Sequence, residues 1–111
     1  IFAVELYFAN AISGLEKEDP DQFPIETVEE TFAVREKATG RFREFFAKAT
    51  DEDWQQTVEL GRINLKASKR KLVAQALTHS MRHWAQIATF LRQSGFKQEW
   101  NHDLLLSKAM E

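Results

Sequence analysis

Cysteine is absent from the 111 residues of this chain. Disulfides, thiolate catalysis and cysteine-based zinc sites are therefore excluded, and a reducing compartment, the cytoplasm, is the expected location. Proline occurs twice and glycine four times, scattered along the chain, so no Gly-rich phosphate-binding loop is present. No apolar run approaches the roughly 20 residues that a bilayer-spanning helix needs, and we expect no membrane partner.

An excess of positive charge is also missing. The chain has 15 Lys and Arg against 17 Asp and Glu, for a formal net charge of −2. Nucleic-acid binding requires clustered Lys and Arg, so nucleic acid is not expected as a partner. Hydrophobic residues make up 43% and charged residues 29%, which together with the length predicts a single globular domain over residues 1–111.

Helical periodicity dominates what is present. Apolar residues recur at helical spacing over residues 1–15, and a second helix is predicted over 27–48, where Thr27 and Glu30 form a capping box. The inner side of this second helix is predicted to carry Phe32, Phe42, Phe45, Phe46 and Ala49. A cap and a single turn are expected at 50–54, and the alternation in 57–66 predicts a short extended excursion or a hairpin. Ser68 then caps the longest helix, which ends at Gly95.

The most informative motif lies on this longest helix, at His79-Ser-Met-Arg-His83. Side chains four residues apart stack on one helix face, so both imidazoles can bind one metal ion. At about 100° per residue, Leu72, His79, His83 and Phe90 fall within about 40° of one another. Ala76 and Ile87 lie just beyond, which places the pair along the edge of an apolar stripe. The alternative is two structural histidines at a helix–helix seam, each hydrogen-bonded to a carbonyl or carboxylate.

The same segment carries a family resemblance. The His-x3-His pair, Gln86 three residues later and the Leu91-Arg-Gln-x-Gly95 ending resemble the last bundle helix of DinB-like (damage-inducible) proteins. This superfamily includes the bacillithiol and mycothiol S-transferases. The tail from Trp100 to Met110 is similar to the family's ending, where Asp-Leu-Leu recurs before a Ser-containing close.

This resemblance implies an all-α fold, a four-helix bundle connected up-down-down-up, with a divalent metal held at one end of its core. The family's metal is usually held by three histidines, two of which match His79 and His83. By the same resemblance, the third would fall immediately before Ile1 and the first helix earlier still, so the first helix is expected to be missing from this chain. A chain with two imidazoles is expected to hold metal weakly.

Four other side chains are candidates for the site. Glu5, on the border of the first helix's apolar face, is a candidate ligand or acceptor for an imidazole N–H, or else forms a plain salt bridge. Gln86 is a candidate for hydrogen bonding a ligand or a metal-bound water, or for bonding between helices. Arg35 falls on the apolar side of the second helix and is a candidate for binding an anionic substrate group; the alternatives are snorkelling to solvent or pairing with a carboxylate. His102 in the tail is expected to face solvent.

The functional expectation is a metal-dependent enzyme of DinB-like type, either a thiol S-transferase or a hydrolase. A histidine-bound zinc, nickel or iron ion would activate a water or a low-molecular-weight thiol that comes with the substrate. The alternative is a non-catalytic dimeric helical module with a vestigial or structural histidine site. We expect a homodimer in either case, because a bundle without its first helix exposes an apolar groove.

Overall fold

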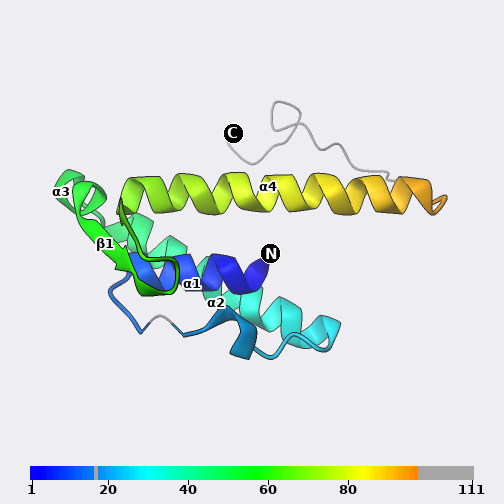
Figure 1. Ribbon diagram of the computed structural model, residues 1–111, viewed down its shortest axis with the longest axis horizontal. Helices are drawn as coiled ribbons and strands as arrows, with labels where there is room; N and C mark the ends of the chain where they lie inside the picture. The colour runs from blue at the N-terminus through cyan, green and yellow to red at the C-terminus, as the bar shows by residue number, and fades with distance from the viewer. Residues whose placement is uncertain (17, 98–111) are drawn as a thin grey trace. The chain divides into compact units, whose positions relative to one another are not determined.

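A computed structural model describes residues 1–16 and 18–97. The chain divides into two compact units, Ile1–Met81 and Arg82–Glu111. The elements are α1 (Phe2–Ile12), η1 (Pro20–Gln22), α2 (Val28–Lys48), α3 (Asp51–Gln55), β1 (Thr57–Leu60), η2 (Gly61–Ile63), β2 (Leu65–Ser68) and α4 (Lys69–Gln93) (Figure 1). The protein is therefore mostly helical, as predicted, with a small two-stranded sheet.

The helix ends follow the predicted capping residues. Thr27 and Glu30 form a capping box at the start of α2, with both reciprocal hydrogen bonds present. The Lys71 N–H donates to Ser68 Oγ at 3.3 Å in the first turn of α4. Gly14 and Gly95 have φ of 69° and 83°, in the left-handed region that favours glycine. At each of them, the following N–H bonds back five residues, which is the Schellman arrangement that closes a helix.

Helix α1 lies at the centre of the first unit. Eight of its eleven residues are buried, because it packs against α2 on one side and against the hairpin and the start of α4 on another. Figure 1 shows α1 alongside α2 within this unit. Ala9 and Ala38 are both completely buried, and small side chains at these positions let helices approach closely. One core cluster comprises Tyr7, Phe8, Ala11, Ile12, Leu60, Ala67, Leu72, Val73 and Ala76, and a second comprises Phe2, Leu6, Val34 and Ala38.

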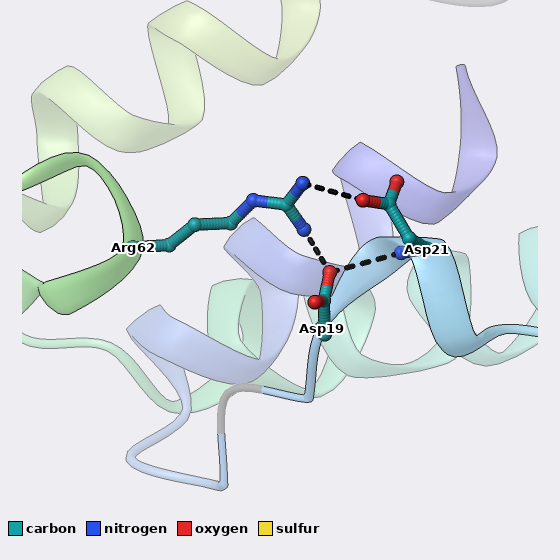
Figure 2. Close-up of polar contacts among 3 residues, drawn as sticks. All are labelled: Asp19, Asp21 and Arg62. Carbon is teal, nitrogen blue, oxygen red and sulfur yellow. Dashed lines mark hydrogen bonds and ion pairs between the residues drawn. The ribbon is translucent and has the colours of Figure 1, made fainter.

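The hairpin confirms the extended excursion predicted between α3 and the longest helix. Strands β1 and β2 pair antiparallel, with Thr57 opposite Ser68 and Leu60 opposite Leu65. From its turn, Arg62 reaches the start of η1, where its guanidinium bonds both Asp19 and Asp21 (Figure 2). The Nη2 to Oδ2 distance to Asp21 is 2.7 Å. Since these groups are exposed, water weakens the attraction, and the contact orients the loop more than it stabilises the fold.

The structure corrects part of the predicted inner face of α2. Phe32 and Phe46 are 45% and 49% exposed, whereas Val34 and Ala38 are the buried residues of this helix. Phe42 and Phe45 do pack against the core, as expected. The four-helix arrangement itself stays a prediction. Within residues 1–16 and 18–97, no helix combines the length and apolar character that a membrane span requires.

Candidate functional site

Both candidate metal ligands lie on α4, which is helical without a break from Lys69 to Gln93. His79 belongs to the first compact unit and His83 is among the first residues of the second. Each ring is half-buried. The predicted spacing of four residues on one helix is therefore present in the structure, and the role of the pair as ligands stays a prediction.

The surroundings of His79 are set by the packing of α4 on the first unit. Leu72 and Ala76, two turns and one turn before His79, are 2% and 4% exposed and belong to the core. Ser80, the residue after His79, is 8% exposed, and its hydroxyl donates a hydrogen bond to the carboxylate of Glu5 on α1. Glu5 therefore accepts from a buried hydroxyl next to His79. Its predicted role beside an imidazole is not tested by this contact.

In the second unit, His83 has a partner on its own helix. Its Nδ1 lies 2.8 Å from Oε1 of Gln86, three residues further along α4. A carboxamide oxygen only accepts hydrogen bonds, so Nδ1–H of His83 is the donor in this contact. Ligating histidines in proteins are usually oriented by an acceptor of this kind on the other ring nitrogen.

The apolar stripe predicted on α4 is buried for only part of its length. Ile87 and Phe90 are 37% and 68% exposed, in contrast to Leu72 and Ala76. The expectation that a second copy of the chain covers the apolar groove of this helix stays a prediction. Burial follows the stretch of α4 that packs on α1 and the hairpin.

The donor set meets only part of what a metal ion needs. No group of three or more His, Cys, Asp or Glu side chains that could hold a metal occurs in the described part of the chain. A catalytic zinc site typically has three protein ligands and a water. Two imidazoles completed by water would suit zinc, nickel or iron, but such a site would bind the metal weakly. His102 lies outside the described residues.

A cavity of about 230 Å³ borders Glu5 in the first unit. Its wall is mostly apolar and is built by α2 and the first half of α4, with Phe42, Phe46, Val73, Ala76 and Leu77 among its lining residues. Glu5 lines the cavity and also accepts the hydrogen bond from Ser80. An apolar space and a carboxylate are thus present beside the stretch of α4 that carries His79.

Arg35 lies elsewhere in the first unit. Its guanidinium carbon is 5.9 Å from the ring centres of both Phe2 and Phe32, within the range of a cation–π contact. It is exposed and is not among the residues lining the cavity beside Glu5. The structure therefore does not bring Arg35 together with Glu5, and substrate binding by Arg35 stays a prediction.

Ser80 is a polar residue near the candidate site that the sequence patterns did not single out. A signal for it exists, because position 80 follows Val73 by seven residues and Ala76 by four, and both of these are buried. A serine on that face needs a hydrogen-bond partner. Its partner, Glu5, lies 75 residues away in the sequence, so periodicity alone could not identify it.

Comparison with known proteins identifies the family of the chain. No curated protein and no solved structure has significant similarity to the chain. The sequence profile of the DinB family matches residues 1–110, nearly the whole length. The chain therefore belongs to the DinB family.

Proposed function

We propose that this DinB-family chain binds a divalent metal through His79 and His83 and acts as a thiol S-transferase or hydrolase. The observation that carries the proposal is the hydrogen bond of 2.8 Å between His83 Nδ1 and Gln86 Oε1. An acceptor on Nδ1 would orient the ring so that Nε2 can bind a metal, as acceptors beside metal ligands do. When bound, the metal would lower the pKa of a coordinated water or thiol.

The protein's own groups would have three tasks in this reaction. Gln86 orients the His83 ring, and the cavity beside Glu5 holds the apolar part of a substrate. Glu5 accepts from Ser80 and so steadies α4 next to His79. Because the chain contains no cysteine, a thiol nucleophile would have to be a small molecule that enters with the substrate.

A metal titration tests the proposal. We expect Zn²⁺ and Co²⁺ to bind weakly in calorimetry, and His79→Asn or His83→Asn to abolish saturable binding. Gln86→Ala should weaken binding about 10- to 100-fold, whereas Gln86→Glu keeps an acceptor and should retain it. His102→Asn is the matched control and should bind as the unmodified chain does. If His79→Asn or His83→Asn bound metal as tightly as the unmodified chain does, the assignment of these residues as ligands would be refuted.

A second candidate function has its own supporting observation. Several apolar side chains of α4 are exposed. Leu77 and Met81 in the first unit are 63% and 71% exposed, and Trp84 and Phe90 in the second are 45% and 68% exposed. Exposed apolar patches of this kind are typical of protein–protein contacts. The corresponding proposal is a non-catalytic module that forms a homodimer through this helix.

A further inference from the structure

A second cavity of the first unit lies at the other end of the α4 stretch that carries His79. It has a volume of about 350 Å³ and is lined by the C-terminal half of α2, the end of α1, α3 and the first residue of α4. At 1.5 Å per helical residue, Lys69 at this cavity and His79 are about 15 Å apart along the helix. The cavity is therefore separate from the candidate metal site, and ligand binding in it does not depend on the proposed function.

The two carboxylates that line this cavity already have partners. Glu44 pairs with Lys48 at 2.7 Å, and Asp53 Oδ2 accepts from the N–H and hydroxyl of Thr50 at 2.9 and 2.8 Å. The hydrogen bond from Lys48 lowers the pKa of Glu44, and those from Thr50 lower the pKa of Asp53. Both carboxylates are therefore ionised near neutral pH, and Asp53 also interacts electrostatically with Lys69.

Two further cations, Arg41 and Lys69, also line the cavity. Arg41 is half-buried, and no hydrogen bond or ion pair engages its guanidinium among the residues that the structure describes. It also lines the neighbouring cavity with Glu18 and Glu30, but no ion pair in the described chain joins it to either. Lys69 Nζ lies 5.4 Å from the ring centre of Phe45. A half-buried arginine with no anionic partner in the described part of the chain can form charge-assisted hydrogen bonds with the anionic group of a ligand.

The rest of the wall is apolar. Ile12 is 1% exposed, Phe45 is half-buried, and Leu15 is 47% exposed at the rim. The volume lies in the range of small-molecule sites, which combine apolar walls with a few polar groups. A planar guanidinium matches a carboxylate through two parallel hydrogen bonds. We propose that this cavity binds a small aromatic or branched-chain carboxylate, with its charge on Arg41 and Lys69 and its apolar body against Ile12 and Phe45.

The unmodified chain provides the first test, with phenylacetate and its neutral isostere phenylacetamide as probes. In ¹H–¹⁵N correlation spectra at constant ionic strength, we expect saturable phenylacetate shifts at the amides of Ile12, Phe45 and Lys69. Phenylacetamide should bind at least about tenfold more weakly, because it lacks the charge that strengthens the hydrogen bonds. Absence of saturable phenylacetate binding, or equal affinity for the two probes, would overturn the proposal.

Variants then locate the charge. Arg41→Gln should lower phenylacetate affinity at least about tenfold, and Arg41→Lys, which keeps the charge without the fork, should fall between it and the unmodified chain. Arg70→Gln is the matched control, since Arg70 is exposed, neighbours Lys69 and loses the same charge. Equal weakening by Arg70→Gln and Arg41→Gln would mean general attraction, not a site. If Arg41→Gln lowers the thermal midpoint, the acid–amide comparison on the unmodified chain still decides.

Discussion

The hydrogen bond from Ser80 to Glu5 joins α4 to α1 beside the candidate site, and its removal has a calculable effect. Ser80 is 8% exposed, and the Glu5 carboxylate is half-buried. Hydrogen bonds to charged groups contribute about 1.5–3 kcal/mol, and a buried acceptor left without its donor loses a similar amount. Because Glu5 keeps some access to water, we expect Ser80→Ala to cost about 1–2 kcal/mol. A chain of this length has a total stability of about 5–15 kcal/mol.

The assay is urea unfolding of a double-mutant cycle made from Ser80→Ala, Glu5→Leu and the double variant. Alanine favours a helix slightly more than serine does, by a few tenths of a kcal/mol. Thr78→Ala corrects for this, since Thr78 is exposed and its hydroxyl bonds only within the helix, to the carbonyls of Ala74 and Gln75. We expect a coupling energy of about 1 kcal/mol between positions 5 and 80, within the range for residues in contact.

Two results would refute this reasoning. A coupling energy below about 0.3 kcal/mol is what independent sites give, and it would mean that the bond does not stabilise the folded chain. The second is a Ser80→Ala variant that is as stable as the unmodified chain after the correction from Thr78→Ala. In that case the Ser80 hydroxyl contributes nothing to the packing of α4 on α1.

Two further predictions concern the faces of α4. In urea unfolding, Leu72→Ala should lower the free energy of unfolding by about 2–5 kcal/mol, because Leu72 is 2% exposed in the core. Leu77 is 63% exposed, so Leu77→Ala should lower it by less than about 1 kcal/mol. Equal losses in the two variants would contradict the observed packing of the helix. In sedimentation velocity, the unmodified chain should be a dimer, and Met81→Glu should convert it to a monomer, because a charge at a buried apolar contact is destabilising. If the unmodified chain stayed a folded monomer at high protein concentration, self-association would be contradicted.

The boundaries of the elements could be predicted from sequence because local interactions determine them. Thr27 and Glu30 satisfy each other's backbone N–H groups three residues apart, and a glycine with positive φ ends both α1 and α4. The hairpin between α3 and α4 could also be predicted, from alternation alone. In each case, the residues that decide the geometry lie within about one turn of the position where it changes.

The buried faces could be predicted only in part, since they depend on neighbours from elsewhere in the chain. Angular position placed Phe32 and Phe46 inward on α2, yet Val34 and Ala38 are the residues that α1 covers. Small residues at the contact bring the two helices close, and the larger rings then extend to the edge of the interface. A count of helical angles shows where an apolar stripe lies but not how much of it another element covers.

The candidate site also combines a local contact, which the sequence can suggest, with a contact between distant parts of the chain, which it cannot. The bond between His83 and Gln86 joins two residues of one helical turn, so the sequence could suggest it from spacing. The partner of Glu5 is a serine on the last helix, and only the packing of α4 on α1 brings the two together. Orientation of an imidazole can thus be encoded within α4, while steadying that helix beside His79 requires the first unit to be folded. Variants of Gln86 should therefore act on metal affinity at unchanged stability, and variants of Ser80 should act first on stability.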